Sequence, residues 1–203
     1  MQTLTTRAFL LASELHANQR RKASLAPGVP YLSHLIEVAG MVMASGAPEV
    51  VVAAAFLHDA IEDQGNRTRN AIREQLGSEV LTLVEECTEQ GTGGATKAPW
   101  LERKEAALLS IPTLTAFAFM IRVADKLQNA REIYHNVSLR GDDAYAGFRV
   151  EKSLVLWYHR EALKAMQQHL ITLRGEYPHQ PSLLITHCWL QDLAEMLSFL
   201  QSQ

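Results

Sequence analysis

Apolar residues recur along the chain with the spacing of amphipathic helices. In the first such stretch Leu4, Ala8, Leu11 and Leu15 share one face, because positions three and four apart are neighbours on a helix. No stretch keeps the strict alternation of a strand, and no hairpin signal joins two β-branched runs. The pattern predicts an all-α fold, with helices over Leu4–His16, Tyr31–Ala44, Pro48–Asp63, Thr68–Gln75, Glu79–Glu86, Trp100–Ser110, Thr115–His135, Val150–Leu173 and Ser182–Leu200.

Glycine and proline residues separate the expected helices. The stretch Ala26–Pro30 breaks the chain before the second helix. Three glycines make Thr88–Pro99 the clearest flexible loop of the sequence, and Leu139–Gly147 reads as a further loop.

Composition limits the class of protein. The chain has 203 residues, of which 47% are hydrophobic, so we expect a single globular domain over residues 1–203. A net charge of −3 provides no overall attraction to nucleic acid or to an anionic membrane. Two distant cysteines, no signal peptide and no bilayer-length apolar run predict a cytoplasmic protein without a membrane or nucleic-acid partner.

The stretch Phe56–Asp63 carries the first candidate chemistry. An apolar helix that begins at Val50 ends in His58, Asp59, Glu62 and Asp63. On a continuous helix these side chains form one stripe, which is costly to bury without compensation. A bound cation is the simplest compensation, and a solvated helix end is the alternative.

Two further residues share this context. His34 lies on an apolar helix, and Asp125 lies where the helix Thr115–His135 turns polar. With His58 and Asp59 they make a set of mixed nitrogen and oxygen ligands, which suits Mn²⁺, Fe²⁺ or Zn²⁺. Taken alone, His34 is better explained as a core histidine, and its companions make it a ligand candidate.

Several ordered motifs resemble the HD superfamily of metal-dependent phosphohydrolases. The resemblance is closest to the (p)ppGpp hydrolase domain of RelA/SpoT proteins and to the stand-alone small alarmone hydrolases. It covers roughly Leu4–Met166 and leaves a helical extension over about 167–203. Gln64 and Gln128 depart from it, since many members have threonine at the first position and the long enzymes often have histidine at the second. The matching segments are Gln19–Lys22, Pro30–Leu35, Ala54–Asp63, Leu76–Val80, Val84–Thr88, Leu101–Lys104 and Ile121–Arg131.

The resemblance implies a role for each motif. It makes His34, His58, Asp59 and Asp125 the ligands of Mn²⁺ in a single-domain helical bundle. Glu62 and Asp63 would then act on the attacking water as catalytic residues, or support the ligands from behind.

The resemblance also implies a nucleotide-binding set. It assigns substrate contacts to Arg21, Lys22, Asn129, Lys152 and Tyr158. The alternatives are a solvated basic turn for the first two residues and a core position for Tyr158. Arg103 and Lys104 are expected to pair with the flanking Glu102 and Glu105 rather than with phosphate.

The implied activity is Mn²⁺-dependent hydrolysis of the 3′-diphosphate of (p)ppGpp. The chain leaves no room for a synthetase domain, so a dedicated hydrolase is expected. Two alternatives remain open: the same site acting on ppApp or on the 2′-phosphate of NADPH, and a non-catalytic module that binds alarmone. The expected partner is a small nucleotide substrate. Whether the protein also forms a homo-oligomer is left open by the sequence.

Overall fold

The computed structural model describes residues 2–22, 24–89 and 98–203, and within them the regular structure is helical. The all-α prediction is confirmed, and a single isolated bridge between Arg20 and Pro30 is the one β-type pairing of the described residues. The elements are α1 (Leu4–Leu15), α2 (Leu32–Ala44), α3 (Glu49–Leu57), α4 (Ala60–Gln64), α5 (Thr68–Leu76), α6 (Ser78–Cys87), α7 (Trp100–Ser110), η1 (Ile111–Thr113), α8 (Ala116–Arg140), η2 (Gly141–Tyr145), α9 (Lys152–Glu176) and α10 (Pro181–Ser202).

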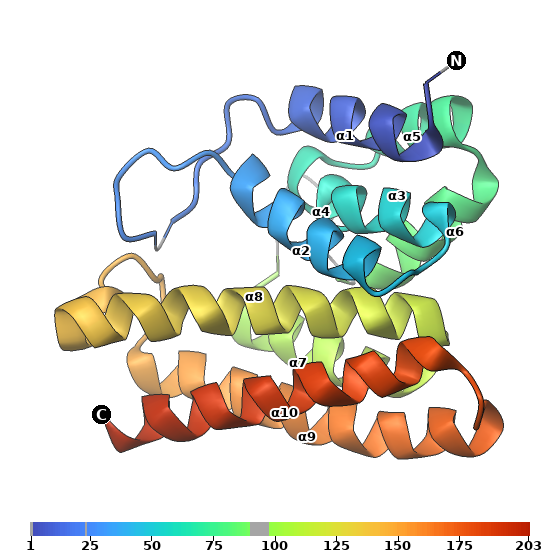
Figure 1. Cartoon of the computed structure of the whole chain (residues 1–203). Helices are drawn as coiled ribbons and strands as arrows, with labels where there is room; N and C mark the ends of the chain where they lie inside the picture. Colours follow the sequence, from blue (N-terminus) through green and yellow to red (C-terminus); the bar gives the residue numbers. More distant parts are fainter. Residues whose placement is uncertain (1, 23, 90–97) are drawn as a thin grey trace.

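Helix α8 is the central element of the fold. It lies between the N-terminal helices and the C-terminal pair α9 and α10 (Figure 1), and it contacts α2, α3, α6, α9 and α10. Its middle is buried on every side, polar residues included, among them Arg122, Asp125, Lys126 and Gln128. Polar groups in such a position need partners, and their partners make up the site described below.

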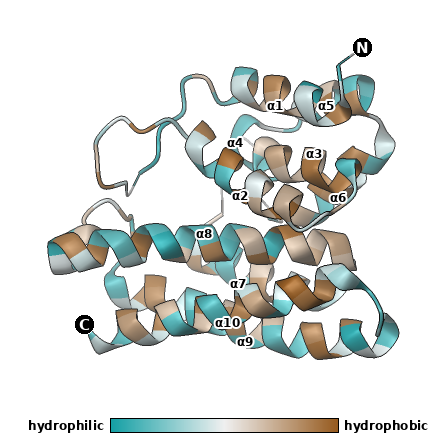
Figure 2. Ribbon diagram, in the orientation of Figure 1, coloured by the Kyte–Doolittle hydropathy of each residue, from teal (hydrophilic) through white to brown (hydrophobic). Residues whose placement is uncertain are grey.

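Helix α3 is apolar from Val50 to Leu57, which Figure 2 shows as a mostly brown ribbon, and Val51–Leu57 are buried. A helix without a polar face belongs in a core, so α3 carries the chain through the interior. It delivers His58 at its C-terminal end.

The predicted continuous helix over Pro48–Asp63 is wrong at His58 and Asp59. There the chain makes a turn between α3 and the five-residue helix α4, which ends at Gly65 with φ 87°. The interruption lets His58 and Asp59 point towards α2 and α8. Glu62 and Asp63 are carried separately on α4.

Two loop predictions have different outcomes. Leu139 and Arg140 belong to α8, and residues 141–145 form a 3₁₀ turn, so the loop predicted over Leu139–Gly147 is wrong in its first part. The predicted flexible loop Thr88–Pro99 falls largely on residues 90–97, which lie outside the described residues. Helix α10 packs against α8 and α9 through buried Leu190, Leu193 and Leu197.

None of the helices over the described ranges is long and apolar enough to cross a membrane.

Candidate metal centre and substrate cavity

Two histidines and two aspartates from separate elements converge on one point. His34 comes from α2, His58 and Asp59 from the break between α3 and α4, and Asp125 from the middle of α8. The Nε2 atoms of the histidines lie 3.3 Å apart. Asp59 Oδ2 lies 3.1 Å from His58 Nε2 and 3.6 Å from His34 Nε2. Asp125 Oδ1 lies 3.4 Å from His34 Nε2 and 3.8 Å from His58 Nε2. Four donor atoms therefore surround one small volume.

Hydrogen bonds fix the orientation of both imidazole rings. His58 Nδ1 donates to the carbonyl oxygen of Ala55 at 2.8 Å. His34 Nδ1 donates to Gln128 Oε1, and Gln128 Nε2 donates to Glu37 Oε2 at 3.1 Å. A proton on Nδ1 leaves the Nε2 lone pair available to a metal ion. Gln128, which departs from the long enzymes of the family, thus orients His34.

The carboxylates dominate the electrostatics of this cluster. Burial by itself lowers the pKa of His58, but Asp59 and Asp125 outweigh burial and raise it to about 10. Burial opposes ionisation of Asp125, yet Lys126 and the two histidines hold its pKa well below the usual range. A field that attracts a proton this strongly also attracts a cation. The donor set fits a divalent transition ion, for which imidazole and carboxylate are suitable ligands.

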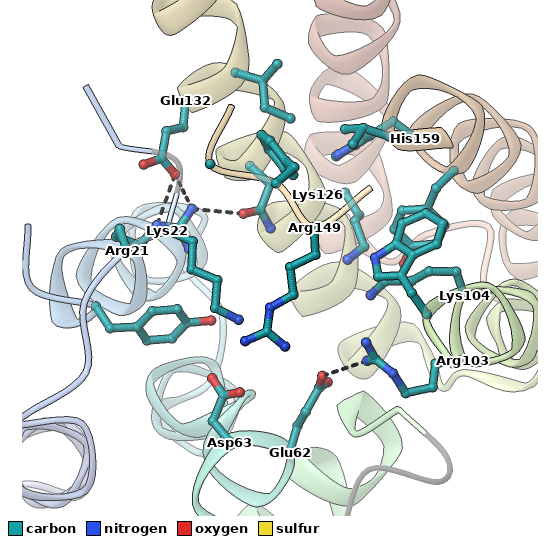
Figure 3. Close-up of a pocket in the computed structure, with 18 of the residues that line it drawn as sticks. Arg21, Lys22, Glu62, Asp63, Arg103, Lys104, Lys126, Glu132, Arg149 and His159 are labelled. Atoms are coloured by element: carbon teal, nitrogen blue, oxygen red, sulfur yellow. Dashed lines mark hydrogen bonds and ion pairs between the residues drawn. The ribbon is translucent and has the colours of Figure 1, made fainter. Parts of the chain in front are cut away.

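Glu62 and Asp63 lie side by side on α4 at the edge of a cavity, as Figure 3 shows. Burial, together with the charges of Glu89 and Asp59, raises the pKa of Glu62 to about 7. Arg103 Nη1 lies 3.6 Å from Glu62 Oε1. Asp63 Oδ2 accepts a hydrogen bond of 2.7 Å from Gln19 Nε2.

Replacing Glu62 by Gln should stabilise the metal-free protein at alkaline pH. The pKa of Glu62 rises from 4.5 to about 7 on folding, so its ionisation opposes folding. This loss of folding free energy is absent below pH ~4.5 and reaches its full size above pH ~7. Its full size is on the order of 3 kcal/mol, reduced by the favourable interaction of Glu62 with Arg103. Thermal unfolding of Glu62→Gln in EDTA should therefore show a gain of about 1–3 kcal/mol at pH 8 and little gain near pH 4.5. A gain independent of pH would contradict a raised pKa.

The cavity next to the cluster is strongly cationic. It encloses about 500 Å³, and seven Lys or Arg side chains of the described residues line it, against three carboxylates. Arg21 and Lys22 lie on one side, as Figure 3 shows, and Arg20 also lines the cavity. Arg103, Lys104, Lys126 and Arg149 lie on the other sides, with Lys22 and Arg149 directed towards Glu62 and Asp63 (Figure 3). The chain as a whole has a net charge of −3, so the excess of positive charge is local to the cavity. This excess favours an anionic ligand.

The cavity and the histidine–aspartate cluster share residues at their boundary. Tyr31 lines the cavity and donates from its hydroxyl to Asp59 Oδ2 at 2.5 Å. Lys126 and Asn129 also line it and contact Asp125, at 2.9 Å from Lys126 Nζ to Oδ2 and 2.5 Å from Asn129 Nδ2 to Oδ1. A ligand in the cavity would therefore lie next to the cluster.

Four of the five predicted nucleotide contacts line the cavity. Arg21, Lys22, Asn129 and Tyr158 are lining residues. The Arg21 guanidinium is held by Glu132 and by Asn129 Oδ1 at 3.0 Å. Lys152 is the exception, because it is not one of the described residues that line the cavity. Its Nζ pairs with Asp142 Oδ1 at 2.6 Å.

The prediction that Arg103 and Lys104 pair with Glu102 and Glu105 is wrong. Both contact the buried Glu89 instead, at 3.3 Å from Arg103 Nη1 and 2.5 Å from Lys104 Nζ. One buried carboxylate thus holds two cations in the wall of the cavity.

The sequence interpretation also missed Lys126, Arg149 and His159. Lys126 follows a predicted ligand directly, and this adjacency was the available signal. Nothing in the sequence pattern marks Arg149 or His159 as cavity residues. Burial and the charge of Lys126 lower the pKa of His159 to about 3, so its ring is neutral.

Comparison with known proteins identifies the family of the chain. A model of the HD domain matches residues 8–149. The chain belongs to the HD domain family. A relative from Synechocystis, named a probable guanosine-3′,5′-bis(diphosphate) 3′-pyrophosphohydrolase, is 33% identical over 132 residues, which cover 64% of this chain and 17% of the relative. Human MESH1, a protein named with the same activity, is 36% identical over 124 residues, covering 60% of this chain and 65% of MESH1. The matches thus span less than two thirds of these relatives.

Solved structures share the HD-domain fold. A metazoan SpoT ortholog, described as hydrolysing ppGpp, superposes with a TM-score of 0.68 at 21% identity, over 87% of this chain and 97% of its own. A protein of Listeria monocytogenes superposes with a TM-score of 0.64 at 28% identity, over 81% of this chain and 99% of its own. Both alignments extend past the 142 residues of the family match.

Proposed function

We propose that this HD-domain protein hydrolyses the 3′-diphosphate of (p)ppGpp to GDP or GTP and pyrophosphate, with Mn²⁺ held by His34, His58, Asp59 and Asp125. The observation that carries the proposal is the cationic cavity beside a cluster of imidazole and carboxylate donors. A highly charged phosphate ester suits such a cavity. The activity for which the Synechocystis relative and human MESH1 are named supports the guanosine alarmone as substrate.

Each part of the site has a task in this proposal. Mn²⁺, when bound, would polarise a phosphoryl oxygen and lower the pKa of water. Glu62 and Asp63 orient the attacking water and take its proton as the new oxygen–phosphorus bond forms. The bond from phosphorus to O3′ breaks, O3′ gains a proton, and pyrophosphate leaves. Lys104, Lys126 and Arg149 stabilise the charge on the phosphates.

Arg21, Lys22 and Tyr31 serve the nucleoside end of the substrate. The Arg21 guanidinium carbon lies 5.4 Å from the centre of the Tyr31 ring, so the ring supports a planar cation that is suited to stacking on a base.

We also assign the protein to the cytoplasm, since Cys87 and Cys188 are both free thiols.

The test is turnover of a nucleotide panel with Mn²⁺, resolved by ion-exchange chromatography. Release of pyrophosphate from ppGpp and pppGpp is the expected result. Faster turnover of ppApp, or inorganic phosphate from NADPH, would move the assignment to another nucleotide. Binding of ppGpp without turnover would establish a non-catalytic module.

Replacing Arg21 by Ala should weaken substrate binding more than it slows the chemistry. The change removes a cation and leaves the Glu132 carboxylate without this partner in the cavity wall. We expect KM to rise roughly 10–100-fold, as for a lost charge-assisted contact, with kcat nearly unchanged. Arg160→Ala on the exposed face of α9 is the matched control. A fall in kcat at constant KM would place Arg21 among the catalytic groups.

A further inference from the structure

A side chain from outside helix α4 holds Asp63 in place. The Asp63 carboxylate is exposed, so burial does not fix its rotamer. Gln19 lies 44 positions earlier in the chain, and its Nε2 donates to Asp63 Oδ2 at 2.7 Å. An amide is a neutral donor, so it orients the carboxylate without adding a cation beside it.

The Gln19 amide is itself held in one orientation. Its Oε1 accepts a hydrogen bond from Gln64 Nε2 at 2.8 Å and lies 2.8 Å from His16 Nδ1. In the flipped orientation the Gln19 oxygen would face the Asp63 carboxylate, which can only accept a hydrogen bond. The carboxylate therefore fixes which end of the Gln19 amide meets it.

Helix α4 needs this support. It has five residues, from Ala60 to Gln64, and so short a helix is not stable by its own hydrogen bonds. Gln19 contacts both of its last two residues, Asp63 and Gln64. Gln64, which stands where many members of the family have threonine, thus contacts Gln19 directly.

Gln19 also closes the loop that carries the cations of the nucleoside end. The Tyr31 backbone N–H donates to the Gln19 carbonyl oxygen at 3.0 Å. Arg20, Arg21 and Lys22 follow directly and line the cavity. The base of this loop is therefore tied to α4 through Gln19 and to Asp59 through the Tyr31 hydroxyl.

We propose that Gln19 is a positioning residue for Asp63, and that His16 and Gln64 hold the Gln19 amide in the orientation that this role requires. This inference rests on the proposed function, because it concerns the residue that acts on the attacking water. Loss of the Gln19 side chain removes the hydrogen bonds to Asp63 and Gln64, so the Asp63 carboxylate is less well oriented towards the water. The nucleotide contacts remain in place, because the loop keeps the backbone hydrogen bond from the Tyr31 N–H to the Gln19 carbonyl oxygen.

Steady-state kinetics on Gln19→Ala, Asp63→Asn and the double variant test the proposal. Gln19→Ala should lower kcat about 10–100-fold, the cost of a small misplacement of a catalytic group, with KM within about twofold and Mn²⁺ content unchanged. In the Asp63→Asn background the same change should have no further effect on kcat, since its target is already lost. Gln168→Ala on the exposed face of α9 is the control.

Three kinetic outcomes would overturn the proposal. They are an unchanged kcat in Gln19→Ala, a rise in KM alone, and losses that multiply in the double variant. The side-chain amide resonances of Gln19 give a second readout, which should shift in Asp63→Asn. If the parent releases no pyrophosphate from ppGpp, the proposed function fails instead. Gln19 resonances that do not respond to Asp63→Asn would then overturn the positioning role independently.

Discussion

Protein treated with EDTA is expected to lose hydrolysis of ppGpp and to regain it with Mn²⁺ better than with Mg²⁺. The two imidazole nitrogens lie 3.3 Å apart, and each lies 3.1–3.8 Å from one oxygen of Asp59 and one oxygen of Asp125. Imidazole suits Mn²⁺ better than Mg²⁺, which prefers oxygen ligands and retains its water. Since metal polarisation is worth several kcal/mol, removal should cost about a thousandfold or more in rate.

A change to one predicted ligand should separate metal binding from the rest of the site. Asp59→Asn keeps the size of the side chain and removes a charge 3.1 Å from His58 Nε2. The parent should show a higher midpoint of thermal unfolding when Mn²⁺ is added, because a ligand that binds the folded state stabilises it. Asp59→Asn should lose most of that increase. Asp192→Asn, which breaks a surface pair with Arg131, is the control. Full activity of the stripped parent would contradict a metal-dependent reaction.

Replacing either acidic residue of α4 should abolish most of the turnover without loss of metal. We expect Glu62→Gln and Asp63→Asn each to lower kcat by about 10²–10⁴-fold, the range for general acid–base catalysis. Both residues line the cavity, whereas the four predicted ligands are other side chains. Metal content should therefore stay near that of the parent. Metal analysis alongside steady-state kinetics measures both effects.

The control for this pair is Glu85→Gln, which removes a carboxylate that pairs with Arg69 on the surface. Loss of bound Mn²⁺ in step with activity would show that Glu62 and Asp63 hold the metal. An unchanged kcat in both variants would show that another group activates the water. Glu62→Gln is also the variant with an expected gain of stability at alkaline pH, so a fall in its activity cannot be ascribed to unfolding.

The residues of the cluster were predictable from the sequence because their context is local. An apolar helix that turns polar marks His58, Asp59 and Asp125, and helical periodicity places His34 on an inward face. The uniform apolarity of Val51–Leu57 likewise predicts a buried helix. These signals lie within one or two turns of chain, which is the range over which backbone preference and side-chain spacing act.

Tertiary packing decided the rest of the site. The local sequence favours a continuous helix, but the helix is interrupted at His58 and Asp59. There the two side chains enter the cluster while α4 carries Glu62 and Asp63 to the cavity. Arg103 and Lys104 pair with Glu89 rather than with their neighbours on α7, because Glu89 is buried and its charge needs compensation. Gln19 meets Asp63 from 44 positions away. Such contacts depend on how α1, α4 and α8 pack against one another, and no local pattern encodes those packing angles.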